Sequence, residues 1–145
     1  MRHRMAVAAL ALVGLLVSVY LLLYKLGVVG QIVCVGSSGC ERVQLSRWST
    51  LLGVPVAAYG VAGYVVLLGL ALFGLRADQL ARPTSSRWIA ALSALGVLFS
   101  IYLLALELFS IHAICIWCSV SGVVILAIFV VSAGALAGAR RAPAP

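Results

Sequence analysis

The stretch WIAALSALGVLFSIYLLALELF, residues 88–109, carries one charged side chain, Glu107, in an otherwise uncharged run of about 20 residues. An α-helix rises about 1.5 Å per residue, so a run of this length crosses the roughly 30 Å hydrocarbon core of a membrane. Three other runs of this kind occur at 5–24, 54–75 and 114–139. Hydrophobic residues make up 65% of the 145-residue chain and charged residues only 9%, which excludes an ordinary soluble domain. We therefore predict an all-α integral membrane protein with a single domain over residues 1–145, folded as a four-transmembrane-helix bundle.

The basic residues predict how this bundle lies in the membrane. Of the ten Lys and Arg residues, seven fall in the two tails and the 76–87 loop: Arg2, Arg4, Arg76, Arg82, Arg87, Arg140 and Arg141. The other three, Lys25, Arg42 and Arg47, fall on the opposite side. Because cytoplasmic loops carry the excess of Lys and Arg, we expect both termini in the cytoplasm. The net charge of +7 then reports membrane orientation, and we expect no nucleic-acid partner.

The two ends of the chain need separate interpretation. The first apolar run follows Arg2 and Arg4 as in a secretory signal, but it exceeds the usual length of a signal's apolar region. No small-x-small cleavage site stands out before Lys25, so we expect a retained helix. The Pro/Ala-rich tail at 140–145 is predicted to be disordered.

All four cysteines fall on the predicted outer side of the membrane. Cys34 and Cys40 lie in the long outer loop at 28–53, and Cys115 and Cys118 begin the fourth span. Disulfides form and persist on that side. In the second part of the loop, ERVQLSRWSTLLGVP (41–55), apolar and polar residues alternate as in a short amphipathic helix. We predict that this half-helix forms a lid over the outer mouth of the bundle.

The cysteine spacing points to thiol chemistry. A CxxC at a helix start brings two sulfurs within bridging reach, and the helix N-terminus favours the thiolate, so Cys115 and Cys118 are predicted to be reactive. The glycine-containing segment between Cys34 and Cys40 allows a disulfide that serves either as a static staple or as a mobile shuttle to the CxxC. The sequence has no CxxCH, dinucleotide-binding glycine pattern or ferredoxin-type cysteine run. A lipid-soluble quinone is the remaining common two-electron carrier, and Cys118, deeper in the fourth helix, is better placed to meet it.

The ordered set of Cys34, Cys40, SRWSTLLGVPVAAYG (46–60) and CIWC (115–118) resembles the bacterial branch of the vitamin K epoxide reductase (VKOR) family. The resemblance implies a four-helix bundle around a quinone with a half-helix lid. It also implies that Cys34 exchanges with a thioredoxin-like partner, that Cys40 passes electrons to Cys115, and that Cys118 faces the quinone. Ser46 matches the family's lid serine, whose hydroxyl donates to the quinone carbonyl as charge develops on oxygen. The neighbouring Arg47 and Trp48 match the same stretch as accessory residues.

The resemblance also implies a setting for the reaction. Many bacterial members continue into a fused thioredoxin-like domain, which this chain lacks, so we expect a separate thioredoxin-fold (DsbA-like) partner outside the cytoplasm. The expected reaction is thiol oxidation coupled to reduction of menaquinone or ubiquinone in the bacterial plasma membrane, without a metal. Activity on vitamin K epoxide stays open.

Several other side chains are weaker candidates. Glu107 is the only acidic residue within a predicted span, and such groups are functional hypotheses by default; a proton relay is one interpretation, an ion pair with Arg42, Arg47 or His112 the other. His112 lies three residues before Cys115 and either stabilises its thiolate or is an exposed interfacial histidine. Four aromatic residues either line a ring pocket or serve in packing: Tyr59, Tyr64, Phe99 and Tyr102.

Two alternatives compete with the VKOR interpretation. A DsbB-type quinone reductase is also a four-helix bundle with two cysteine pairs, but there the CxxC comes in the first outer loop, whereas here the order is reversed. A membrane protein without enzymatic activity would use the four cysteines as a structural or zinc site. The gap between the two pairs is unlike the spacing of usual zinc knuckles.

Overall fold

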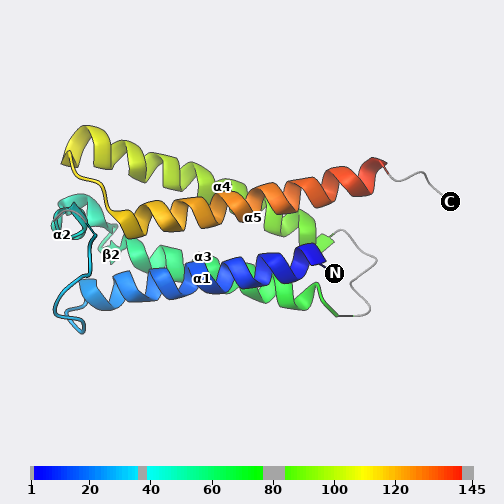
Figure 1. The fold of residues 1–145 in the computed structure, drawn as a ribbon, viewed down its shortest axis with the longest axis horizontal. Helices are drawn as coiled ribbons and strands as arrows, with labels where there is room; N and C mark the ends of the chain where they lie inside the picture. The colour runs from blue at the N-terminus through cyan, green and yellow to red at the C-terminus, as the bar shows by residue number, and fades with distance from the viewer. Residues whose placement is uncertain (1, 36–38, 77–83, 142–145) are drawn as a thin grey trace.

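The computed structural model describes residues 2–35, 39–76 and 84–141, and four long helices dominate it (Figure 1). They are α1 (Arg2–Lys25), α3 (Val56–Phe73), α4 (Thr84–Leu106) and α5 (Ile116–Arg141). A short π-helical turn, η2 (Glu107–Ile111), extends α4. All four are long and apolar enough to span a membrane. The predicted four-transmembrane-helix bundle is therefore confirmed.

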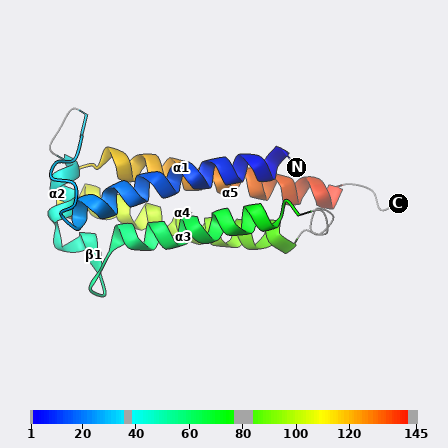
Figure 2. The same cartoon turned by 90° about the horizontal axis from the view of Figure 1, so that it is seen from below.

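The helices form an antiparallel bundle in which α1 and α4 are diagonal. Both α1 and α4 pack against α3 and α5, and Figures 1 and 2 show the four helices side by side along one long axis. The start of α1 and the end of α5 lie at one end, whereas α2 and the starts of α3 and α5, with the cysteines, lie at the other (Figure 1). Which end faces the cytoplasm stays a prediction.

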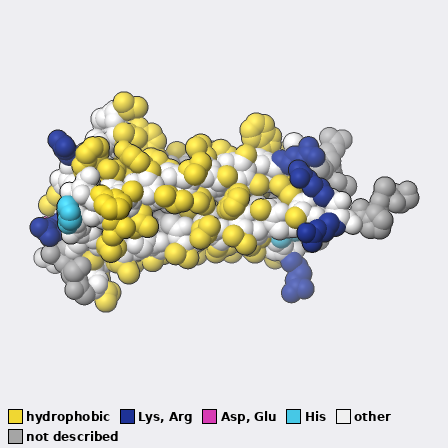
Figure 3. All heavy atoms as spheres, turned by 90° about the horizontal axis from the view of Figure 1, so that it is seen from above, with side chains coloured by type: hydrophobic (Ala, Val, Ile, Leu, Met, Phe, Trp, Pro, Cys, Tyr) yellow, Lys and Arg dark blue, Asp and Glu magenta, His cyan; other side chains and the backbone are white. Residues whose placement is uncertain are grey.

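The outer surface of the bundle is apolar. Figure 3 shows hydrophobic side chains along the length of the bundle, with Lys and Arg gathered at its two ends. Large side chains such as Leu16, Leu95 and Leu98 are exposed on the helices. Lipid is as apolar as these side chains, so such residues face it without penalty. Two buried serines satisfy their hydroxyls within their own helix, since Ser93 and Ser132 each donate to the carbonyl oxygen four residues earlier.

Small residues allow the helices to approach closely. A methyl group added at Gly14 would overlap the Tyr64 ring, and one at Gly60 would lie 2.8 Å from Ser18 Oγ. Gly96 is similarly covered by Ile125, whereas nothing lies within 4 Å of such a methyl group at Gly63. At Gly60 and Gly96 the small residue therefore allows two helices to pack closely. Gly63 does not have this role, because no neighbouring helix lies close to it.

The second part of the outer loop, together with Val54 and Pro55, folds as a lid, residues 39–55, with three parts. It consists of α2 (Gly39–Leu45), the 3₁₀ turn η1 (Arg47–Ser49) and a hairpin of β1 (Thr50–Leu51) and β2 (Val54–Pro55). The amphipathic helix expected from the 41–55 pattern is therefore shorter than predicted. Leu52 and Gly53 both have positive φ, as a two-residue type I′ hairpin turn requires, and Leu52 is 91% exposed at its tip.

The helix boundaries differ from the predicted spans by a few residues. Val54 and Pro55 belong to β2, so the second span begins at Val56. Pro55 has extended backbone angles and lacks an N–H, which suits the residue before a helix. Arg140 and Arg141 continue α5 and are not part of a disordered tail; the rest of that predicted tail lies outside the described residues.

The Gly14–Tyr64 contact gives a test of the bundle packing. Gly14→Ala should lower the free energy of unfolding by about 1–3 kcal/mol, because the added methyl group forces the Tyr64 ring away. Thermal unfolding in detergent measures this loss. Gly134→Ala is the matched control, since nothing lies near a methyl group there, and its melting temperature should be unchanged or raised. Equal melting temperatures for Gly14→Ala and wild type would contradict the packing described.

Candidate functional site

The first cysteine pair is a disulfide between the outer loop and the lid. Cys34 and Cys40 are bonded, with their Cα atoms 6.1 Å apart. Cys40, on the first turn of α2, is fully buried, whereas Cys34 is half-buried between the exposed residues Val33 and Val35. One sulfur of the pair therefore lies near the outer surface and the other faces the protein interior.

The second pair begins α5. Cys115 directly precedes the first helical residue, and its Sγ accepts a hydrogen bond from the backbone N–H of Cys118 at 3.4 Å. An N-cap side chain makes this bond to the third helical residue, so the Cys115 sulfur acts as the N-cap acceptor of α5. The Cys118 thiol also hydrogen-bonds this sulfur and thereby lowers the pKa of Cys115 below its usual range. Both thiols of this pair are free.

Glu107 organises the turn that leads into α5. Its backbone carbonyl accepts hydrogen bonds from the N–H groups of His112 and Ala113. Its carboxylate Oε2 accepts the N–H of Cys115 at 3.1 Å, and the carboxylate also interacts with the Cys118 side chain. Only 3% of Glu107 is exposed. Arg42, Arg47 and His112, the partners expected for an ion pair, do not bind Glu107. Its carboxylate instead contacts groups of the CxxC.

The two cysteine pairs meet in one cluster of side chains. Cys40 and Cys115 are both fully buried and belong to one hydrophobic cluster with Val17, Leu21 and Val43. Cys34 and Cys118 are partly buried and pack against this cluster. The fold therefore brings the four cysteines into one site, although 74 residues lie between Cys40 and Cys115 in the sequence.

A large cavity lies below this cluster within the bundle. Its volume is about 850 Å³, and residues of the lid and all four spans line it. Cys118, Glu107, Ser46 and Trp48 are among the lining residues, and most of the remaining wall is aliphatic. An apolar chamber with a few polar groups is the usual form of a small-molecule site. We call it the inner chamber.

Three of the four candidate aromatic residues line the inner chamber. They are Tyr59, Tyr64 and Phe99. The Tyr64 hydroxyl donates to the Ser121 carbonyl at 2.8 Å, which ties α3 to α5. Tyr102 stacks on Phe99 and is exposed toward the lipid-facing surface. Sequence alone could not separate these positions, because helical spacing does not tell a chamber wall from a lipid-facing wall.

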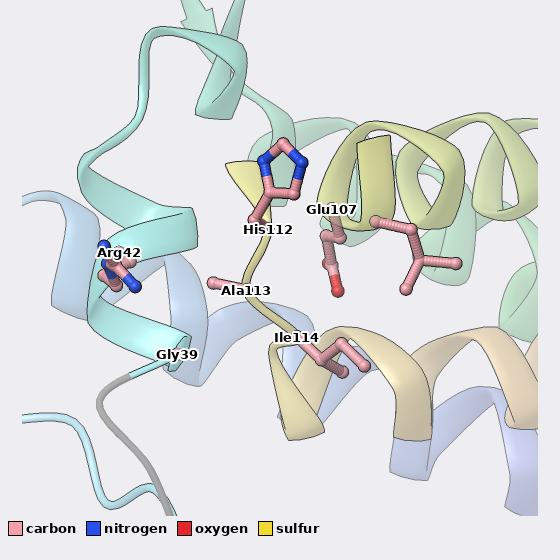
Figure 4. Close-up of a pocket in the computed structure, with 7 residues that line it drawn as sticks. Gly39, Arg42, Glu107, His112, Ala113 and Ile114 are labelled. Carbon is pink, nitrogen blue, oxygen red and sulfur yellow. The ribbon is translucent and has the colours of Figure 1, made fainter. Parts of the chain in front are cut away.

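The remaining candidates divide between the lid and a second cavity. The Ser46 hydroxyl donates to the Val43 carbonyl at 2.7 Å at the end of α2 while also facing the chamber. Arg47 is exposed, with its guanidinium 5.1 Å from the centre of the Trp48 ring, and does not line the chamber. His112 is exposed and lines a separate cavity of about 550 Å³ on the outer side, shown in Figure 4.

Lys25 joins the lid to the first span, and sequence reasoning assigned it only to membrane orientation. Its Nζ donates to the Gln44 carbonyl and to Ser49 Oγ, both at 2.6 Å. The Ser49 hydroxyl also bonds the carbonyls of Gln44 and Ser46. Carbonyls in the last turn of a helix lack helical partners, and a cation there is favourable. Lys25 therefore fixes the end of α2 above the inner chamber.

Tyr20 and Trp117 hold the backbone beside Cys34, and no sequence signal identified them. The Val33 N–H donates to the Tyr20 hydroxyl at 3.0 Å, and Trp117 Nε1 donates to the Val33 carbonyl at 2.7 Å. The two rings meet edge to face, with centres 5.2 Å apart. Trp117 is one of the two residues inside the CxxC, so the CxxC itself positions the loop cysteine.

The structure bears on the zinc alternative as well. Within the described ranges 2–35, 39–76 and 84–141, no group of three or more His, Cys, Asp or Glu side chains is arranged to hold a metal ion. Two of the four thiols are joined in the Cys34–Cys40 disulfide. The geometry is that of a thiol–disulfide site.

The Lys25 contacts predict that the lid loosens when this cation is removed. Lys25→Met should raise the KM for a short-chain quinone roughly tenfold, because charged hydrogen bonds of this kind contribute about 1.5–3 kcal/mol. The change in kcat should be smaller. Arg140→Met, which makes the same charge change at the opposite end, should leave KM unchanged; an unchanged KM in Lys25→Met would refute this role.

The Tyr20–Trp117 contact predicts the rigidity of the loop next to Cys34. Trp117→Phe keeps an aromatic ring against Tyr20 but removes the Nε1–H, with an expected local loss of about 1 kcal/mol. Hydrogen exchange of the backbone amides in residues 31–35 should become faster. Tyr102→Phe, at a ring away from the loop, serves as the control. Identical exchange in Trp117→Phe and wild type would show that the bond does not restrain the loop.

A comparison with models of known protein families places these features in one family. The model described as the vitamin K epoxide reductase family matches residues 5–133, which include all four cysteines and the lid. The match supports the VKOR interpretation over the DsbB-type alternative.

Proposed function

The chain belongs to the vitamin K epoxide reductase family and is thus a membrane thiol oxidoreductase that uses quinone, and we propose that it oxidises an extracytoplasmic thioredoxin-fold protein. The electrons pass from the partner's dithiol to Cys34 and Cys40, then to Cys115 and Cys118, and finally to quinone. The observation that carries this proposal is the order of the sulfurs, from the outer loop through the buried cluster to the inner chamber.

Each step of the proposed path is a two-electron exchange. The partner's two thiols reduce the Cys34–Cys40 disulfide and become a disulfide themselves. A thiolate of the reduced loop pair then attacks the Cys115–Cys118 disulfide, which leaves the CxxC as two thiols. These thiols reduce quinone to quinol, so that two electrons and two protons leave the CxxC as its disulfide reforms. The structure has the loop pair oxidised and the CxxC reduced, which is the state that precedes this last step.

The surroundings of each sulfur suit its proposed role. The half-buried Cys34, flanked by the 83%-exposed Val35, is the sulfur of the loop pair closer to the outer surface. Cys40 and Cys115 exchange within a fully buried cluster, where water does not compete for the sulfurs. The lowered pKa of Cys115 favours its thiolate, the form that takes part in exchange.

The inner chamber supplies the proposed quinone site. Its volume, about 850 Å³, lies within the usual 300–1,000 Å³ range of ligand pockets, and its wall is mostly apolar. Cys118, the second cysteine of the CxxC, lines the chamber, and Ser46 lines it from the lid. In the proposed complex the Ser46 hydroxyl turns from the Val43 carbonyl to a quinone oxygen, where it stabilises developing negative charge.

The proposed setting follows from charge and redox chemistry. The chain would lie in a bacterial plasma membrane with both termini in the cytoplasm, since most of its Lys and Arg residues are at the end that holds the termini. The cysteines would then face the oxidising side, where a DsbA-like protein is available as partner.

Replacing the chamber-facing sulfur tests this function most simply. Cys118→Ser should abolish quinone reduction, followed by absorbance, when the membrane-embedded protein is mixed with a reduced thioredoxin-fold protein and a short-chain quinone. The Cys34–Cys40 disulfide should still be reduced by the partner, because Cys118 takes no part in that step. Cys34→Ser is the matched variant and should block the partner step itself. Quinone reduction that survives in Cys118→Ser would overturn the assigned path.

A further inference from the structure

Glu107 lies between two separate cavities. It lines the inner chamber together with Cys118, and it also lines the cavity of about 550 Å³ on the outer side. Figure 4 shows this outer cavity, with His112 and Ala113 beside Glu107 and Arg42 of α2 across the space. Within the part of the chain that the structure describes, Glu107 alone lines both cavities.

The groups around Glu107 leave its carboxylate in contact with the reacting thiols. Cys115 donates its N–H to Oε2, and the Cys118 side chain shares a hydrogen bond with the same carboxylate. The charged or titratable groups that line the two cavities with it are Arg42 of α2, His112, Cys118 of α5, and Tyr59 and Tyr64 of α3. Of these groups, Cys118 interacts directly with the Glu107 carboxylate.

The chemistry of the proposed function requires a proton acceptor at this place. A thiolate is the reactive form of a cysteine, so Cys118 must lose its proton before its sulfur reduces quinone. The inner chamber is mostly apolar, and among the described residues no carboxylate other than Glu107 lines it. A positioned carboxylate within hydrogen-bond reach of the thiol is the usual solution to such a step.

Resting on the proposed function, we propose that Glu107 carries the proton between the Cys118 thiol and water in the outer cavity. In this step the Cys118 S–H bond breaks, the proton moves to the Glu107 carboxylate, and the electron pair stays on sulfur. The carboxylic acid then releases the proton to water on the outer side. Quinone, as substrate, takes up two electrons from the CxxC and two protons from water, equal in number to the two protons that Cys115 and Cys118 lose.

A purely structural role would not require a carboxylate. The turn into α5 needs an acceptor for the Cys115 N–H, and the neutral amide oxygen of glutamine would supply one. A buried acidic group in a membrane protein is costly and marks a functional site by default. Glu107 also faces two cavities, whereas a turn acceptor needs contact with only one backbone group.

The experiment compares the pH profile of quinone reduction in wild type and Glu107→Gln. The full chain in lipid vesicles receives dithiothreitol as dithiol donor and a short-chain quinone as acceptor. Glu107→Gln should lower the rate about 100-fold near neutral pH. Its rate should then rise about tenfold per pH unit toward alkaline pH, because Cys118 must lose its proton without the carboxylate. Reduction of the Cys34–Cys40 disulfide by dithiothreitol should be unaffected.

Further variants separate the proton route from effects on folding. Glu41→Gln removes the charge of an exposed glutamate outside both cavities and should behave as wild type. Ala113→Phe keeps Glu107 but fills the outer cavity that Ala113 lines, and should also slow quinone reduction. If Glu107→Gln does not fold, the Ala113→Phe result decides: a slowed rate supports the route, and a wild-type rate overturns it.

Two outcomes for Glu107→Gln would overturn the inference. One is a wild-type rate and pH profile; the other is a rate equally low at every pH while the Cys34–Cys40 disulfide is still reduced. In both cases wild type reduces quinone, so the proposed function stands and only the role of Glu107 fails. Failure of wild type itself to reduce quinone would instead contradict the proposed function.

Discussion

The N-terminus of α5 imposes the constraint on which the site depends. The first N–H groups of a helix have no helical acceptors, and in an apolar environment each must be satisfied by the protein. Here Glu107 Oε2 accepts the Cys115 N–H, and the Cys115 sulfur accepts the Cys118 N–H. The groups that satisfy these N–H donors are therefore the carboxylate and the thiol that take part in the proposed chemistry. The requirements of folding and of reactivity place the same atoms together.

The capping of α5 by Cys115 determines where the other parts of the site lie. Because Cys115 caps α5, its sulfur is fixed in the buried cluster with Cys40, and Cys118 lies within the helix beside the inner chamber. The lid is held over that chamber by Lys25, which bonds the end of α2 from the end of α1. Trp117 reaches from the CxxC to the backbone of Val33, next to Cys34. Each of these contacts restrains a cysteine or the chamber wall.

The sequence was sufficient to predict the four spans and to single out the four cysteines, but not to predict the contacts between segments. Apolar runs of about 20 residues are strong sequence signals, because lipid excludes unpaired backbone and charge over that whole length. The hairpin at residues 50–55 gave no such signal, since leucine is not a residue typical of a positive-φ turn position and Leu52 occupies one. Lys25, Tyr20 and Trp117 act through backbone groups 13 or more residues away, and only the folded chain reveals such partners. Glu107 was recognised as unusual, whereas its place between two cavities required the structure.

In the proposed path, electrons cross from the loop pair to the CxxC between Cys40 and Cys115. A double variant, Cys34→Ser with Cys118→Ser, leaves these two as the only cysteines, and mild oxidation followed by mass spectrometry of its peptides tests this transfer directly. We predict a Cys40–Cys115 disulfide in this variant. We predict no disulfide between Cys34 and Cys115 in the matched Cys40→Ser, Cys118→Ser variant. Two free thiols in the first variant, or a disulfide in the second instead, would contradict the proposed transfer.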